Sequence, residues 1–523
     1  MGQERQEPQT SRAIEDVKDL QPELLRSVPL HACLGIAGRA WWQNQKGVAD
    51  FCMQTATNEY DYFFSHDWRT SGRLKYVSLL IVFNGVPAAL SSFVVSTCLG
   101  VLTYFGFLSR SAWSLLPGHV VPWLVLVFWQ DVLRLFRKPE RAFLDSLCIP
   151  QDDQDLKERC IRGLAAYLCR SKKLVVLWSP NYFRRLWCTF EVGFFLMNLQ
   201  GQVEDITFVP VQIGTLCILC YATATVFRLT LFLVQYSGLP FMDFVIVVII
   251  AVFVLAICLT PAFFYYWSAL LRDVFDLPRQ LREFRLESSE CFCCSHGHRH
   301  PVSGENIFCD RALIYQNLKV RGCGGREEQA LDAFNGHVRR ILAPNIEQKS
   351  KHHLLVLKHT LVATAAACFP HLAVSIPRSL ERRVTGWRAN VLFAGSQIFL
   401  DLAVVFLLRV TLLIGQLGHQ RFFRRHRFFA IAMQVVAFCL AACGVLLPWP
   451  LSVILAANNS MLPFVSVVLL LLANICLLRP LLRSSPPKSC SMAAERPTPA
   501  PIPAVDLHSL DNSDNESGSC FEI

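Results

Sequence analysis

The residues best suited to chemistry lie in one segment of the chain, Ser179–Glu191. The segment reads Ser-Pro-Asn-Tyr-Phe-Arg-Arg-Leu-Trp-Cys-Thr-Phe-Glu and follows the apolar, strand-like run Lys173–Trp178. An open parallel sheet binds its ligand in a crevice at the carboxyl ends of its strands. Glu191 would therefore bring a carboxylate to that crevice from the start of the next helix. A carboxylate placed there can stabilise positive charge that develops in a transition state.

A second group of reactive side chains lies in residues 291–300, which read Cys-Phe-Cys-Cys-Ser-His-Gly-His-Arg-His, with another cysteine nine residues later. Thiolates and imidazoles at such spacing can close a tetrahedral zinc site. The alternatives are a solvated basic turn and reversible S-acylation of the adjacent cysteines Cys293 and Cys294. The ligand set that we predict for a structural zinc ion is Cys291, Cys294, His298 and Cys309.

The elements that must position these groups alternate between strand and helix patterns. The helical stretch Asp152–Arg170 places Leu156, Cys160, Leu164 and Leu168 on one face, four residues apart. Strands that alternate with helices of this length indicate βα units and a parallel sheet. The predicted strands are Tyr60–Ser65, Ala142–Ile149, Leu174–Trp178 and Ile206–Pro210, and the other predicted helices are Lys75–Asn84 and Asn181–Leu199.

Most of the remaining chain has the composition of a membrane protein. Of its 523 residues, 53% are hydrophobic and 17% are charged, whereas about a quarter of a soluble chain is charged. The apolar residues gather in runs that reach the roughly 20 residues needed to cross a bilayer. We predict about eight spans: Pro87–Leu108, Ser111–Gln130, Gln212–Tyr236, Phe244–Leu271, Leu354–Ile376, Ala389–Gly415, Phe428–Ala457 and Met461–Leu478.

The distribution of charge predicts the topology. The net charge is +10, and basic residues next to the spans favour the cytosolic side. An even number of spans then places both termini and the α/β segments in the cytosol, in a multi-pass integral membrane protein with the lipid bilayer as its partner. Nucleic-acid binding is not predicted, because no basic cluster carries the interleaved aromatic residues of a base-stacking surface.

Three segments, taken in chain order, resemble the TIR (Toll/interleukin-1 receptor-like) domain family. They are Tyr60-Asp-Tyr-Phe-Phe-Ser-His66, Phe143-Leu-Asp-Ser-Leu-Cys-Ile149, and Lys173–Glu191 with its Trp-Cys-x-x-Glu ending. The resemblance implies a flavodoxin-like α/β parallel sheet, here combined with the polytopic helical membrane bundle. The chain departs from the family in one respect: a transmembrane hairpin separates the first predicted helix from the second predicted strand. An insertion whose two ends lie close together is compatible with the fold.

The resemblance also implies an activity and a set of site residues. Glu191 matches the family's catalytic glutamate, and NAD would be the substrate of a hydrolase that cleaves the nicotinamide N-glycosidic bond. The binding residues at the ends of the first two strands would be Phe64, Ser65, His66, Asp67 and Asp145. The alternative for Glu191 is a structural acid that favours the helix dipole or pairs with Arg184 or Arg185.

Two charged residues, Asp401 and Arg409, lie inside one predicted span, and they are the feature that would favour a transporter or channel. Intramembrane charges are costly and frequently functional, whereas mutual or interhelical pairing would make them structural. The function expected first is membrane-tethered signal transduction through the TIR-like domain, with NAD hydrolysis as its chemistry and other TIR-domain proteins or a second copy as partners. The alternatives are a transporter or channel with a regulatory TIR-like domain, and a non-enzymatic membrane scaffold.

These expectations divide the chain into seven parts. They are a polar N-terminal segment 1–58, a TIR-like domain split into 59–84 and 136–210, a transmembrane hairpin 85–135 inside it, a second hairpin 211–271, a cytosolic Cys/His-rich segment 272–351, a four-helix transmembrane region 352–480, and a disordered tail 481–523.

Overall fold

The computed structural model describes most of the chain. The described residues are 24–41, 55–109, 111–150, 153–197, 203–236, 241–299, 304–321, 326–351, 354–381, 387–418, 427–446 and 462–482. The first 23 residues of the predicted N-terminal segment, and the tail beyond Leu482 that we expected to be disordered, lie outside this set.

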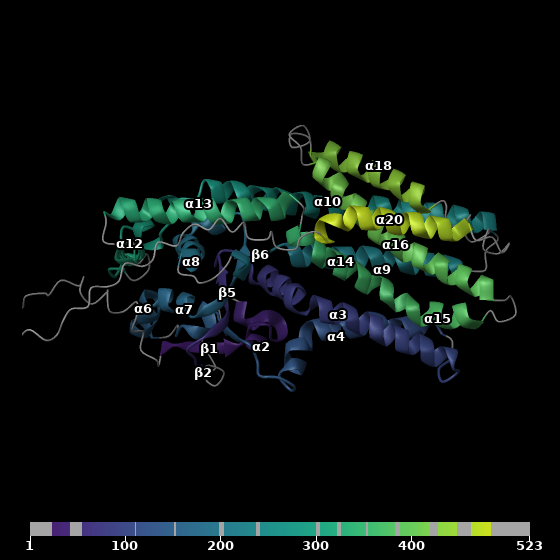
Figure 1. Ribbon diagram of the computed structural model, residues 1–523, viewed down its shortest axis with the longest axis horizontal. Coiled ribbons are helices and arrows are strands. Elements are labelled where there is room, and N and C mark those ends of the chain that lie inside the picture. Colours follow the sequence, from purple (N-terminus) through teal and green to yellow (C-terminus); the bar gives the residue numbers. More distant parts are fainter. Residues whose placement is uncertain are drawn as a thin grey trace, which may run out of the picture. The chain divides into compact units, whose positions relative to one another are not determined.

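A small mixed sheet lies within a largely helical structure (Figure 1). Its strand order is β2-β1-β4-β3-β5-β6. The pairs β3–β4, β3–β5 and β5–β6 are parallel, as the alternation of strands and helices predicted. The strands are β1 (Arg26–Pro29), β2 (Thr55–Ala56), β3 (Tyr60–His66), β4 (Arg141–Phe143), β5 (Ser171–Trp178) and β6 (Ile206–Pro210).

The two halves of the predicted α/β domain therefore share one sheet, although the inserted hairpin separates them in sequence. Phe63 of β3 is in register with both Phe143 of β4 and Leu174 of β5. The last five residues of β5 are all buried. Because successive side chains of a strand point to opposite faces, both faces of the sheet are covered there.

The N-terminal segment extends this sheet, which the sequence did not predict. β1 pairs antiparallel with β4, and β2 pairs antiparallel with β1. Trp41, at the end of η2 (Ile36–Trp41), is buried and donates its indole N–H to the carbonyl of Cys33 at 2.9 Å. Gly72 allows the chain after β3 to approach this segment, because a Cβ there would lie 2.1 Å from the carbonyl oxygen of Trp41.

The helix after β3 and the first membrane span are one element. α3 runs from Gly72 to Tyr104 and continues through Pro87, so the predicted boundary between the α/β half-domain and the hairpin at residue 84 falls inside a continuous helix. Proline in an apolar helix is tolerated where neighbouring helices re-satisfy the freed backbone groups. Here α4 (Leu115–Leu133) packs along α3 (Figure 1).

The helices that follow β4 and β5 are short. The predicted helix Asp152–Arg170 is observed as α6 (Gln154–Arg162) and α7 (Leu164–Cys169), which are separated at Gly163. α8 contacts β3 and β5 and starts later than predicted, because a 3-10 turn comes first. The remaining elements of this part are α2 (Leu30–Cys33), α5 (Asp145–Cys148), η4 (Tyr182–Arg184), α8 (Leu186–Met197) and η5 (Val203–Asp205).

Among the described residues, four helical stretches are long and apolar enough to cross a membrane. They are Gly72–Tyr104, Ala112–Leu133, Ile213–Leu233 and Val356–Leu380. The other four of the eight expected spans fall in helices that are only partly described at the level of side chains: α10 (Phe241–Arg282), α16 (Trp387–Gly418), α18 (Arg427–Leu446) and α20 (Leu462–Leu482). The other helices are η3 (Ala112–Ser114), α9 (Ile213–Tyr236), η6 (Leu286–Ser288), α11 (Phe292–Ser295), α12 (Asp310–Arg321), α13 (Glu327–Lys351), α14 (Leu354–Cys368), η7 (Phe369–His371) and α15 (Leu372–Glu381).

The charges in the apolar helices α9 and α16 pair between the helices. Asp401 of α16 lies 3.2 Å from the guanidinium of Arg228 on α9, and Arg228 is 3% exposed. The sequence had singled out Arg409, on the same helix as Asp401, but did not identify Arg228 as the partner. Interhelical pairing of opposite charges stabilises a bundle, which is the structural alternative that the sequence left open.

Candidate functional site

A cavity of about 350 Å³ is lined by the carboxyl ends of β3 and β4 and by residues of α8, the helix that follows β5. β3 ends at His66, Asp145 follows β4, and α8 begins shortly after β5. The volume lies at the lower end of the roughly 300–1,000 Å³ typical of ligand pockets. The lining residues are Phe63, Phe64, His66, Trp68, Phe143, Asp145, Ile149, Lys157, Ile161, Leu164, Arg185, Trp187, Cys188 and Glu191.

Glu191 is held in this cavity by the end of β3. It lies in the second turn of α8, and its carboxylate accepts a hydrogen bond from the hydroxyl of Ser65. The hydroxyl of Ser65 also pairs with that of the buried Tyr182. Burial raises the pKa of Glu191 to about 8, and Asp145 adds to this, while the bond from Ser65 opposes it. Glu191 is therefore mostly protonated at neutral pH.

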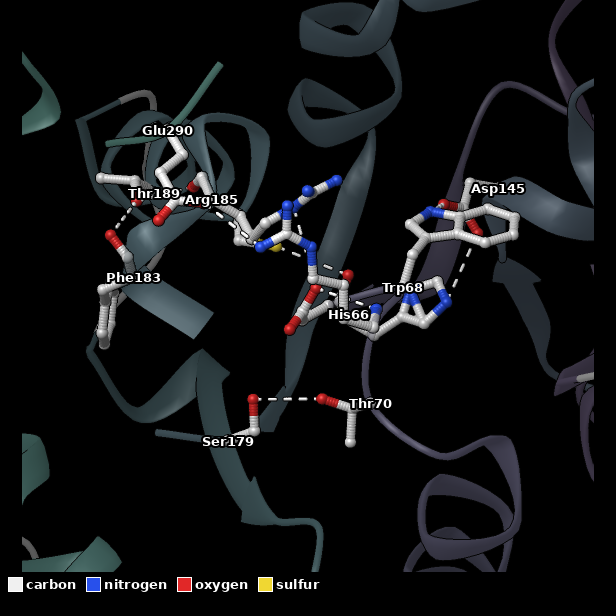
Figure 2. Close-up of polar contacts among 12 residues, drawn as sticks. His66, Trp68, Thr70, Asp145, Ser179, Phe183, Arg185, Thr189 and Glu290 are labelled. Carbon is white, nitrogen blue, oxygen red and sulfur yellow. Dashed lines mark hydrogen bonds and ion pairs between the residues drawn. The ribbon is translucent and has the colours of Figure 1, made fainter. Parts of the chain in front are cut away.

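Asp145 forms a second polar group on the cavity wall, together with two aromatic side chains. The indole N–H of Trp68 donates to its carboxylate at 2.8 Å, and Nε2 of His66 lies 3.9 Å from it. Figure 2 shows Trp68 and His66 beside each other next to Asp145. Burial raises the pKa of Asp145 to about 6. Burial and the charge of Lys75 hold the pKa of His66 well below its usual value, so the imidazole is neutral at pH 7.

Asp67 has a structural role in the loop after β3. Its carboxylate is 1% exposed, accepts the backbone N–H of Arg69 at 3.0 Å and lies 3.7 Å from Nε of Arg185. This ion pair orients Arg185, which lines the cavity (Figure 2). A guanidinium at the cavity wall is suited to bind a phosphate group.

The structure thus brings most of the predicted site residues together. Phe64, His66, Asp145 and Glu191 line the cavity, and Ser65 hydrogen-bonds to Glu191. Asp67 is not among the lining residues and instead orients Arg185. The sequence also allowed Glu191 to pair with Arg184 or Arg185, but in the structure the carboxyl group of Glu191 accepts its hydrogen bond from Ser65.

Cys188, next to the predicted catalytic residue, is a structural thiol. Its Sγ donates to the carbonyl of His66 at 3.4 Å. Burial raises its pKa well above the usual value. A thiol that stays protonated is a poor nucleophile, so the arrangement points to carboxylate rather than thiolate chemistry.

Sequence reasoning missed four residues that shape the site. Trp41 packs edge-on against His66, with ring centroids 5.3 Å apart, and Tyr182 supports Ser65 from behind. Lys75 is buried at the start of α3. Trp68 immediately follows β3 and could have been found from its position, whereas no signal in the sequence links the distant Trp41 to this cavity.

The cysteines and histidine of the predicted metal site lie close together, but around a different centre. Cys293, His298 and Cys309 have their ligand atoms within 4.8 Å of one another, and so do Cys291, Cys293 and Cys294. Sγ of Cys294 lies 3.8 Å from Sγ of Cys309. The residue common to both groups, Cys293, was not in the predicted ligand set.

No protein-family model matches this chain, and no match was found among curated proteins or among solved structures.

Proposed function

We propose that this protein is a membrane protein whose TIR-like α/β domain hydrolyses the nicotinamide N-glycosidic bond of NAD. The single observation that supports this most strongly is the position of Glu191. It lines the cavity at the carboxyl ends of the parallel strands and bonds to Ser65 at the end of the first of them. The TIR-like identity rests on the sequence resemblance.

The strand order gives further support. Taken along the chain, the parallel strands β3, β4, β5 and β6 lie in the order second, first, third, fourth. This is the beginning of the flavodoxin-like order, in which ligands bind where the strand order reverses, between the first and third strands. Ser65 ends the first of these strands and Glu191 follows the third, on the two sides of that point.

The reaction converts NAD and water into nicotinamide, ADP-ribose and a proton. The bond from C1′ of the ribose to the nicotinamide nitrogen breaks, and its electron pair leaves with the nicotinamide. Positive charge then develops on the ribose, as in glycoside hydrolysis. Binding of the cationic nicotinamide favours the ionised form of Glu191 through charge attraction, and the carboxylate stabilises the oxocarbenium-like transition state.

Other cavity residues have roles in binding. Arg185 binds a phosphate of the dinucleotide, while the rings of Trp68 and Trp187 offer apolar surfaces for nicotinamide. His66 is neutral and buried at the base of the cavity, where Trp41 fixes its ring. The dinucleotide exceeds the cavity in length, so its adenosine end extends beyond the cavity.

The test is nicotinamide release from NAD by the purified full chain in detergent or nanodiscs. Loss of an electrostatic contact to the transition state costs about 10²–10³-fold in rate, and Glu191→Ala is expected to show a loss of that size. The matched control is Glu59→Ala, because Glu59 precedes the amino end of β3 and its side chain is 73% exposed. Equal release by the wild type and Glu191→Ala would show that Glu191 does not carry the reaction, and no release by either would leave a non-enzymatic scaffold or interaction domain as the function.

A further inference from the structure

Four cysteines and one histidine of the segment 289–310 converge on a small volume. The two groups of ligand atoms share Cys293, and Cys294 and Cys309 are in contact across them. Cys294 and Cys309 lie 15 positions apart in the sequence, so their contact joins the beginning and the end of this segment. A hydrogen bond from the backbone N–H of Asp310 to Sγ of Cys293, 3.3 Å long, also joins them. N–H donors to sulfur stabilise a thiolate, the form that binds metal.

The distance between the sulfur atoms of Cys294 and Cys309 suits two ligands of one tetrahedral ion. Zn–S bonds are about 2.3 Å long, which places two thiolates of a tetrahedral site about 3.8 Å apart. Cys294 and Cys309 are separated by 3.8 Å. Cys291 and Cys293 are separated by only 3.0 Å, so these two sulfur atoms are too close to be ligands of the same ion in this arrangement.

His298 has an unusual backbone conformation that brings its ring to the thiols. It is the one non-glycine residue of the described part of the chain with a positive φ, 59°. The left-handed region is unfavourable for such a residue, and residues held there cluster at functional sites. Its N–H donates to the carbonyl of Cys293 and its carbonyl accepts from Ile307, both at 2.8 Å.

We propose that Cys293, Cys294, His298 and Cys309 bind a zinc ion, with Cys291 outside the coordination sphere. This set differs from the one that the sequence suggested by the exchange of Cys291 for Cys293. It keeps three thiolates and one imidazole, a ligand combination typical of structural zinc.

The zinc ion holds the segment that packs against the start of α8, and α8 forms one wall of the cavity around Glu191. Next to the ligands, Glu290 and Arg184 pair through their backbones, with Glu290 N to Arg184 O at 2.6 Å and Leu186 N to Glu290 O at 3.1 Å. The hydroxyl of the buried Ser289 donates to that of Thr189 on α8 at 3.1 Å (Figure 2 labels Thr189 and Glu290). These contacts join the metal-binding segment to the first turns of the helix that carries Glu191.

The experiment measures metal content and protection of the backbone in the full chain. Purified protein is expected to hold one equivalent of zinc, and cobalt substitution should give the thiolate charge-transfer absorption of a tetrahedral site. Cys294→Ser is the sharpest variant, because Cys294 reaches the surface and its replacement leaves no internal cavity. It should lose the metal and show faster hydrogen exchange in residues 186–197.

The matched control is Cys291→Ser, a buried cysteine of the same segment, which is expected to keep the zinc. His298→Ala should lose it, like Cys294→Ser. Wild-type protein without zinc or tetrahedral cobalt would overturn the proposal. So would retention of the metal by Cys294→Ser or His298→Ala, or loss of the metal in Cys291→Ser with the fold intact by circular dichroism. None of these readouts depends on NAD hydrolysis.

Discussion

The cavity around Glu191 (the cleft) and the group of candidate metal ligands between Cys291 and Cys309 (the cluster) differ in how far apart their residues lie in the sequence. In the cavity around Glu191, the hydrogen bond between Ser65 and Glu191 joins residues that are 126 positions apart, with the hairpin of α3 and α4 between them. In the cluster, every candidate ligand lies between Cys291 and Cys309. The cleft therefore exists only when the sheet has formed, whereas the cluster depends on short turns.

This difference predicts that a substitution in one region leaves the other region largely intact. Damage to the sheet should remove the cleft and spare the cluster, and loss of the metal should loosen one wall of the cleft without unfolding the sheet. The contacts between the two regions include the backbone pairing of Glu290 with Arg184 and Leu186 and the exposed ion pair of Arg69 and Glu290. Four measurements test whether the two regions respond independently.

The largest effect is expected from Leu174→Ala. Leu174 is fully buried in β5, between β3 and β6, and such a truncation costs about 2–5 kcal/mol of unfolding free energy because it leaves a cavity. Thermal unfolding should occur at a lower temperature and nicotinamide release should fall, while zinc content stays unchanged. Phe292→Ala, at an aromatic ring that is 45% exposed, is the control and should change stability by less than about 0.5 kcal/mol. If Leu174→Ala also lost the metal, the two regions would form one cooperative unit.

A smaller effect is expected from Gly193→Ala, which tests the packing that both regions share. Gly193 lies on α8, and a Cβ there would be 2.2 Å from the ring of Phe334 on α13, the helix that follows the cluster and α12. Overpacking of this kind costs about 1–3 kcal/mol, so the unfolding temperature should fall. The control Gly85→Ala has only one neighbouring atom, at 3.9 Å, and should stabilise α3 by about 0.5–1 kcal/mol. If Gly193→Ala left the unfolding temperature unchanged, α13 would be able to move away from α8.

The next measurement concerns the pH dependence of stability and affects the cleft alone. The pKa of Glu191 rises from 4.5 to about 8 on folding, so the native state holds a proton that the unfolded chain has released between these values. Stability should therefore fall as the pH rises from about 4.5 to about 8. Glu191→Gln mimics the protonated acid and should flatten this dependence, leaving the contribution of Asp145, whose pKa rises from 3.8 to about 6. Identical profiles of unfolding temperature against pH for the two proteins would contradict the assigned environment.

The smallest effect is expected from Arg69→Ala, which removes the ion pair between the regions. Nη1 of Arg69 lies 3.2 Å from Glu290, but the two side chains are 64% and 49% exposed. Exposed pairs contribute about 0.2–1 kcal/mol and weaken with salt. A double-mutant cycle with Glu290→Ala should give a coupling in that range at low salt. A coupling well above it would mean that the two regions depend on each other more than their contacts suggest.

Local patterns were sufficient for several parts of the structure. The four parallel strands follow apolar runs, and Cys160, Leu164 and Leu168 are buried although the predicted helix that carries them breaks at Gly163. The apolar helices follow from runs of hydrophobic residues, although the described residues confirm only four membrane-crossing candidates. The spacing also placed Cys294 and Cys309 in the predicted ligand set, and their sulfur atoms lie 3.8 Å apart.

Other features could not be inferred from local patterns. The sequence split the helix at Pro87, yet α3 continues through it because α4 packs beside it. The predicted ligand set contained Cys291 instead of Cys293, since spacing does not reveal which sulfur atoms point toward one another. The partner of Asp401 proved to be Arg228, on another helix.

The sequence by itself determined the alternation of strands and helices, the apolar helices, and an acid placed just beyond the third parallel strand. Only the tertiary structure decided the environment of that acid: Ser65 as its donor, Tyr182 behind Ser65, and Trp41 against His66. The reason is that periodicity acts over a few residues, whereas the cleft depends on pairing between distant strands. Burial then sets the pKa of Glu191, and burial is a property of the assembled fold.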